Sequence, residues 1–143
     1  MKKYSLIFCI VVSLFLVSCH TRSEFDYLHP TDEIAAVYIV NLQLLDDGEL
    51  LQTERASITD VDFFISEFSQ LECYVYYGDP VAPVSSEKMV DAIKILYSNG
   101  DYELIAYNGK SEYTENKGFN LYAGYRIFNE DEFKNLISSY LDG

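Results

Sequence analysis

Apolar and polar residues alternate through much of the chain after position 33 in a manner typical of β-strands. The β-branched run 34–45, "IAAVYIVNLQLL", predicts one strand, and the segment 49–54, "ELLQTE", predicts a second. Between them lies Asp47-Gly48, a dipeptide that suits a tight turn with positive φ. We therefore expect the first two strands to pair as an antiparallel hairpin.

The pattern predicts further short strands in the second half of the chain. One begins at Cys73 and stops before Gly78 and Pro80, and a last one covers 119–128, "FNLYAGYRIF". The segment 108–118, "NGKSEYTENKG", is polar and is expected to be a connection without its own strand.

Asn99-Gly100 is the strongest local turn signal in the chain, because this dipeptide favours a two-residue hairpin loop. A two-residue loop there pairs apolar residues on one face of the sheet. It also places Lys94 and Glu103 on the opposite face, which is expected to be half-exposed to solvent, where the two side chains can form a diagonal cross-strand contact. The expected core-side pairs are Tyr97 with Tyr102, Ile95 with Leu104, and Ile93 with Ala106.

The segment 59–72 changes to the 3.6-residue period of a helix. Thr59, with Asp62 three residues on, has the spacing of a capping box, although Asp replaces the usual Glu. The apolar stripe of this predicted helix comprises Val61, Phe64, Ile65, Phe68 and Leu71.

A second helix is predicted over 129–141. Asn129 and Glu132 form its capping-box start, and the acidic run 130–132 suits the positive end of a helix. The apolar stripe comprises Phe133, Leu136, Ile137, Tyr140 and Leu141.

These elements follow one another in the order β-β-α-β-β-β-β-α. Because most neighbours are joined by hairpins or short loops, we expect an α+β fold with a mainly antiparallel sheet of about five to six strands. Two helices should pack on one face of that sheet. The prediction is a single small domain over 34–143.

The first 18 residues have a different character. Lys2 and Lys3 precede an apolar stretch from Tyr4 to Val17. As a helix this stretch measures roughly 20 Å, short of the roughly 30 Å hydrocarbon core of a bilayer. Its length is that of a cleavable signal segment, and small Ser18 suits a signal peptidase.

Leu16-Val17-Ser18-Cys19 resembles the lipobox of bacterial lipoproteins. The resemblance implies that the Cys19 thiol receives a diacylglyceryl group and that cleavage falls between Ser18 and Cys19. Residues 1–18 are then the signal peptide, and the domain is lipid-anchored on the extracytoplasmic side of the bacterial cell envelope. Two or three acyl chains make a stable anchor. The alternatives are an uncleaved signal anchor with an incidental Cys19 and a secreted protein cut elsewhere.

The segment 19–33 lacks periodicity and carries Pro30 among polar residues. It is expected to be a flexible tether that holds the domain off the membrane. Both histidines of the chain, His20 and His29, fall within it.

The chain is acidic, with 23 Asp and Glu against 10 Lys and Arg and a net charge of −13. Removal of Lys2 and Lys3 leaves 8 basic residues and a net charge of −15. A field of that sign repels nucleic acid and attracts a cationic partner.

The sequence offers little for catalysis or cofactors. A Ser or Cys nucleophile usually needs a base such as His, and no His lies beyond position 29. The carboxylate clusters have local roles in turns and helix starts, and no Gly-rich phosphate loop or metal-ligand spacing appears. We expect no enzyme activity, no cofactor and no metal. Cys73 is expected to be a buried small apolar residue, with a redox or intermolecular thiol as the alternative.

Thirteen tyrosines and no tryptophan make the domain rich in one kind of aromatic residue. Most are expected to be cross-strand pairs in the sheet. Because side chains alternate between the two faces of a strand, Tyr74 and Tyr76 are expected on the face opposite Cys73. They are the candidate exposed platform for a glycan or peptide. The sequence therefore favours a non-enzymatic binding or interaction domain. The alternative is an inhibitor or immunity protein against a cationic partner, such as a lysozyme-like hydrolase or a toxin.

Overall fold

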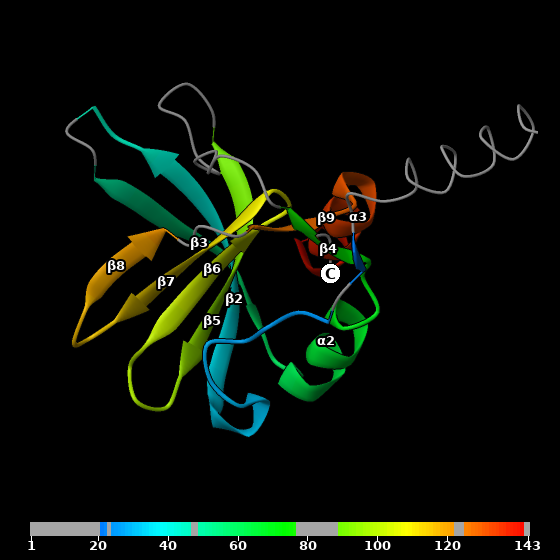
Figure 1. The fold of residues 1–143 in the computed structure, drawn as a ribbon, viewed down its shortest axis with the longest axis horizontal. Helices are drawn as coiled ribbons and strands as arrows, with labels where there is room; N and C mark the ends of the chain where they lie inside the picture. Colours follow the sequence, from blue (N-terminus) through cyan, green and yellow to red (C-terminus); the bar gives the residue numbers. More distant parts are fainter. Residues whose placement is uncertain (1–20, 23, 47–48, 77–88, 122–124, 142–143) are drawn as a thin grey trace, which may run out of the picture.

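The computed structural model describes residues 21–22, 24–46, 49–76, 89–121 and 125–141. In these ranges the chain forms a six-stranded sheet, a small three-stranded sheet and two α-helices (Figure 1). The large sheet has the order β3-β2-β5-β6-β7-β8, and the small one has the order β1-β4-β9. Every strand pair is antiparallel.

The elements of the large sheet are β2 (Ile34–Leu44), β3 (Leu50–Ile58), β5 (Val90–Tyr97), β6 (Tyr102–Ala106), β7 (Gly109–Thr114) and β8 (Gly118–Leu121). Those of the small sheet are β1 (Thr21–Arg22), β4 (Cys73–Tyr76) and β9 (Tyr125–Phe128). The helices are α2 (Val61–Phe68) and α3 (Glu130–Leu141), and a short 3-10 helix, η1 (Thr31–Glu33), precedes β2.

The predicted fold class is confirmed: this is an α+β domain with a mainly antiparallel sheet and two helices on one side of it. Two details differ. The polar segment 108–118 contains β7, in which Lys110 and Glu112 are buried and form an ion pair with each other. The segment 119–128, expected to be one strand, contributes β8 and β9 to different sheets.

The main core lies between the large sheet and the helices. The helical stripes predicted from the sequence all reach it: Phe64, Phe68, Phe133 and Ile137 are buried, and the remaining stripe residues pack around them. Cys73 is 2% exposed within this cluster, so its predicted burial is confirmed. Fully burying side chains of this size contributes about 1.5–3 kcal/mol each to folding.

The helix caps were predicted with mixed success. The side chain of Asn129 accepts hydrogen bonds from the backbone N–H groups of Asp131 (3.1 Å) and Glu132 (3.2 Å), as predicted. At α2 the capping residue is Asp60, whose Oδ1 accepts from the Phe63 N–H at 3.0 Å. The prediction of Thr59 as that cap was wrong by one position.

The β5–β6 hairpin has a different register from the predicted one. Its loop contains three residues, because the Tyr97 N–H donates to the Asp101 carbonyl (2.9 Å) and Gly100 takes φ +89°. The strands consequently pair Ile95 with Glu103. The one-residue shift moves Glu103 from the expected half-wet face to the core face, where it is 0% exposed.

The opposite face of the large sheet is hollowed where residues of β2, β3 and β5 line a pocket. Gln52 on β3 donates from Nε2 to the Tyr102 hydroxyl on β6 at 3.3 Å, although two strands lie between them. This face also holds a second apolar cluster, which no helix of the described residues covers: Val40, Leu42, Ala92, Leu104 and Ala106.

None of the helices in the described ranges has the length and apolar character needed to cross a bilayer. The signal segment 1–18 and Cys19 lie outside the described residues, as does the predicted Asp47-Gly48 turn.

Candidate functional site

The segment Glu24–Glu33, which we call the strap, lies against the domain (Figure 1). Its first anchor is Phe25, whose ring centroid lies 5.1 Å from that of Phe68 and 5.8 Å from that of Phe128. At its other end the Glu33 carbonyl accepts hydrogen bonds from the backbone N–H (2.9 Å) and hydroxyl (3.0 Å) of Ser98. The described part of the segment expected to be a flexible tether is therefore packed on the fold.

A buried charged cluster lies under the strap. Lys110 Nζ is 2.8 Å from Glu103 Oε2 and 2.8 Å from Glu112 Oε1, and it also donates to the Asp26 carbonyl at 2.5 Å. The other Glu103 oxygen accepts from the Tyr97 hydroxyl and, at 3.4 Å, from the Leu28 N–H. Two strap residues, Asp26 and Leu28, thus form hydrogen bonds with a buried ion pair.

Burial and charge act in opposite directions on this cluster. Burial raises the pKa of Glu103, and the ammonium of Lys110 opposes that rise. For Lys110, burial would lower the pKa, but Glu103 and Glu112 together outweigh it and hold the pKa above its usual value. Burial beside the Glu103 carboxylate raises the pKa of the Tyr97 hydroxyl. The ammonium of Lys110 is therefore kept charged where it contacts the strap.

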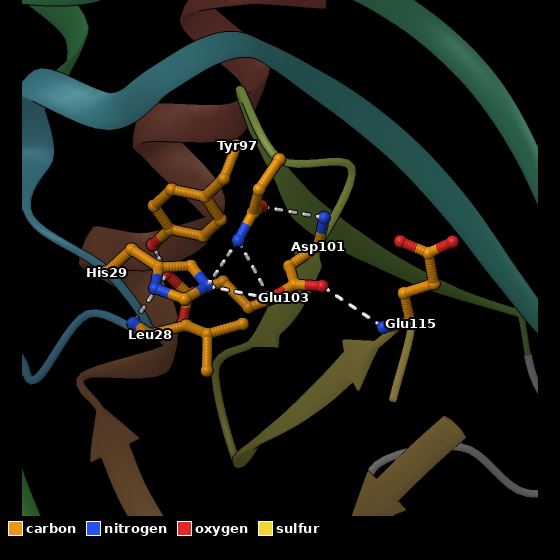
Figure 2. Close-up of polar contacts among 7 residues, drawn as sticks. Leu28, His29, Tyr97, Asp101, Glu103 and Glu115 are labelled. Atoms are coloured by element: carbon orange, nitrogen blue, oxygen red, sulfur yellow. Dashed lines mark hydrogen bonds and ion pairs between the residues drawn. The ribbon is translucent and has the colours of Figure 1, made fainter. Parts of the chain in front are cut away.

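His29 forms a second polar contact between the strap and the sheet (Figure 2). Its Nε2 lies 2.8 Å from Asp101 Oδ2 and 3.2 Å from the Asn99 amide nitrogen. The other Asp101 oxygen accepts from the Glu115 N–H at 3.1 Å. These contacts, with the one from His29 largest, lower the pKa of Asp101.

The sequence reasoning missed this role of His29. It assigned His29 to a flexible tether and to no functional site. The signal that could have found it is Asp101, which directly follows the Asn99-Gly100 turn and is 8% exposed. A carboxylate buried at a turn needs a partner, and His29 supplies one. The imidazole is engaged by Asp101 and Asn99, so its geometry is that of an anchor for the strap.

A pocket of about 300 Å³ opens on the concave face of the large sheet. We call it the Lys94 pocket; its lining residues are Tyr38, Val40, Gln52, Glu54, Lys94 and Leu96. Lys94 Nζ donates to Gln52 Oε1 at 3.0 Å and lies 4.3 Å from the ring centroid of Tyr102. The far face of that ring stacks on Tyr113, with centroids 4.8 Å apart.

Lys94 is the cation of this pocket. Burial lowers its pKa, and the Glu54 carboxylate partly offsets the effect. The pocket therefore combines an ammonium donor, an amide, a carboxylate acceptor and the hydroxyl of Tyr38 above an aliphatic floor. Such a mixture can hydrogen-bond a ligand whose groups both donate and accept.

Two other pockets lie near the helices. One of about 400 Å³ lies between α3 and the start of β5 and includes Met89, Tyr107 and Lys134. One of about 550 Å³ lies beside the start of the strap and includes Phe25, Phe68 and Leu71. Within the described ranges, no group of three or more His, Cys, Asp or Glu residues is placed to hold a metal ion.

The tyrosine pair singled out from the sequence lies on β4, the middle strand of the small sheet. The Tyr74 hydroxyl donates to Glu72 Oε2 at 2.5 Å, and its side chain is partly buried. The side chain of Tyr76 lies outside the described part of the structure, as does Cys19. The structure does not bring Tyr74 into the Lys94 pocket.

No protein-family model, curated protein or solved structure matches this chain.

Proposed function

We propose that the protein is a lipid-anchored lipoprotein of the bacterial cell envelope whose domain binds a glycan in the Lys94 pocket and has no enzymatic role. The lipid is attached at Cys19, after cleavage that removes residues 1–18. The observation that carries the proposed binding role is the concave sheet face, which no helix of the described residues covers and which gathers Lys94, Gln52 and Tyr102.

The chemistry of the pocket favours a glycan. Sugar hydroxyls donate and accept at once, and Gln52, Glu54 and Lys94 offer both kinds of partner within one pocket. The floor of Val40 and Leu96 and the ring of Tyr38 can cover the C–H face of a sugar ring. A neutral glycan is also insensitive to the overall negative charge, which would repel polyanions.

The ligand is tested on a glycan microarray with the purified domain. Lys94→Ala with Gln52→Ala should abolish the signal of any glycan that the unmodified domain binds. Lys134→Ala is the matched control, because it removes an exposed lysine on α3 that is absent from the pocket. Binding that survives the double substitution would place the ligand elsewhere, and an array without a bound glycan would contradict the proposed ligand class.

The anchor is tested separately in cells. Inhibition of the lipoprotein signal peptidase should convert the mature protein to a larger precursor, and Cys19→Ser should release the protein from the membrane fraction. A protein that stays in the membrane with Cys19→Ser would contradict the lipid anchor.

A second candidate function is inhibition of, or immunity to, a cationic hydrolase or toxin. It is favoured by the net charge of −15 expected for the mature chain and by the exposed acidic run Glu130–Glu132 at the start of α3. A partner captured from an extract at low salt and released at high salt would support this function. A salt-independent partner would argue against it.

A further inference from the structure

We infer that the strap holds the mature domain directly against the bilayer, with the small sheet and the end of α2 toward the lipid and the Lys94 pocket facing away. The inference rests on the proposed function, because it needs the lipid on Cys19. It assigns the bilayer as the partner of one end of the domain.

The length of chain between the lipid and the fold sets the first limit. Thr21, the first residue of β1, is two residues after Cys19, and Phe25 is six residues after it. A fully extended chain spans at most about 3.3–3.6 Å per residue. The anchored cysteine can therefore lie no more than about 7 Å from β1, and about 20 Å from Phe25 even if β1 detaches.

The strap keeps this connection short. Its backbone is held at Asp26 by Lys110, at Leu28 by Glu103 and at Glu33 by Ser98, and its side chains are held at Phe25 and His29. If the strap left the sheet, the Glu103–Lys110 pair would lose two of its hydrogen-bond partners and its apolar cover. A released strap would lengthen the free chain to 15 residues, about 50 Å when extended.

The position of Phe25 sets the orientation. The ring packs between Phe68, at the end of α2, and Phe128, at the end of β9. The pocket of about 550 Å³ beside it includes Tyr27 and Leu71, so aromatic and aliphatic surface opens where the chain arrives from the lipid. Figure 1 shows β1 and α2 on one side of the molecule and the end of β2, beside the start of β3, on the other.

The negative charge of the domain also favours contact with the bilayer through one end of the domain only. Its net charge disfavours broad contact with anionic headgroups, so the anchor and a limited aromatic end are better suited to lie at the interface than a sheet face. The concave face then stays accessible to a ligand in the aqueous phase.

The experiment measures which end of the acylated protein is nearer to the lipid. One fluorescent dye is placed at Gln70→Cys, after α2, and another, in a separate protein, at Asp46→Cys, next to the β2–β3 turn; both positions are exposed. Cys19 carries the lipid, and Cys73 is buried, so each protein takes one dye. The proteins are incorporated into phosphatidylcholine vesicles that contain a headgroup-labelled acceptor lipid.

We expect a larger loss of donor emission for the Gln70 dye than for the Asp46 dye. A fifteen-residue Gly-Ser insertion after His20 is the matched variant, because it lengthens the connection between the lipid and β1 and leaves β1 and the strap unchanged. In that variant both dyes should lose less emission, and the difference between them should disappear.

Equal loss for the two dyes, greater loss for the Asp46 dye, or a difference that persists with the insertion would overturn the inference while the lipid anchor stands. If the mature protein does not stay with the vesicles, the proposed anchor and the inference both fail.

Discussion

Lys110 Nζ lies 2.8 Å from Glu103 Oε2 and, in the same position, donates to the carbonyl of Asp26 in the strap. The β6–β7 hairpin thereby connects to a segment 84 residues earlier in the chain. A buried ion pair is costly unless its remaining hydrogen-bonding groups are satisfied. Here the strap provides part of that satisfaction, so the stability of the pair and the docking of the strap are coupled.

Lys110→Met is expected to lower the free energy of unfolding by about 3–5 kcal/mol, because it leaves the buried Glu103 without its cation. The measurement is urea unfolding followed by circular dichroism at neutral pH. The double variant Glu103→Leu with Lys110→Met removes both charges and should be more stable than Lys110→Met alone. A single substitution that costs less than about 1 kcal/mol would show that the pair is solvated and not buried.

Gly100→Ala is expected to destabilise the domain by about 1–2 kcal/mol, the cost of a left-handed conformation for a residue with a Cβ. Space is not the cause, since an added Cβ would meet nothing within 4 Å, whereas φ is +89°. Gly100→Asn is the matched control, because Asn tolerates this conformation better and should cost less. Equal stability of all three proteins in thermal unfolding would mean that the loop does not depend on positive φ.

This hairpin also shows how far the sequence predicts the fold. The apolar stripes of both helices and the turn at Asn99-Gly100 follow from local patterns, and they are correct. The register was wrong because a two-residue loop and a three-residue loop with glycine at its end share the same sequence signal. The expectation that Glu103 stays half-exposed failed because the register shift turns its side chain toward the core. There Lys110, on the next strand, and Leu28, 75 residues earlier in the chain, offset its burial.

The candidate site was less predictable than the fold. The strap looks like a tether because it has no periodicity, and its docking depends on partners 72–84 residues away along the chain. The Lys94 pocket is lined by residues of β2, β3 and β5, and no local pattern encodes which of these strands lie side by side. β7 was missed because its charged residues are paired inside the fold, where alternation of polarity gives no signal.

Asp60→Ala is expected to lower the free energy of unfolding by about 0.5–2 kcal/mol, the usual cost of losing an N-cap side chain. Thr59→Ala, one residue earlier, should cost less, because the described hydrogen bond to the Phe63 N–H comes from Asp60. Chemical unfolding of the two variants side by side separates the alternatives. A greater loss of unfolding free energy for Thr59→Ala would identify Thr59 as the capping residue, as predicted from the sequence, and would contradict the observed geometry of α2.

Asp101→Asn is expected to have a pH-dependent effect on stability. The folded state lowers the pKa of Asp101 below its usual value of 3.8, chiefly through the hydrogen bond with His29. A carboxyl group whose pKa is lower in the folded state than in the unfolded state stabilises the fold at pH values above its unfolded-state pKa. This contribution is lost as the pH falls through the folded-state pKa. The stability difference between the unmodified protein and Asp101→Asn should therefore be full at pH 6 and shrink below about pH 4.

Urea unfolding at pH 6, 4 and 3 measures this difference. Asp32→Asn, which changes an exposed carboxyl in η1, is the control and should lack the same pH dependence. A difference for Asp101→Asn that stays constant over this range would mean that the carboxylate form is not specifically stabilised.

Lys94 is expected to lose its proton at a lower pH than an exposed lysine does, because burial lowers its pKa. Glu54→Gln should lower that pKa further, since the Glu54 carboxylate partly offsets the burial. Reductive methylation with ¹³C-labelled formaldehyde allows the methyl signal of each lysine to be followed through a titration by NMR. Lys117, whose side chain is exposed, is the internal reference. If Lys94 titrates with or above Lys117, the ammonium is not desolvated, and the concave face does not form the enclosed polar pocket on which the binding proposal depends.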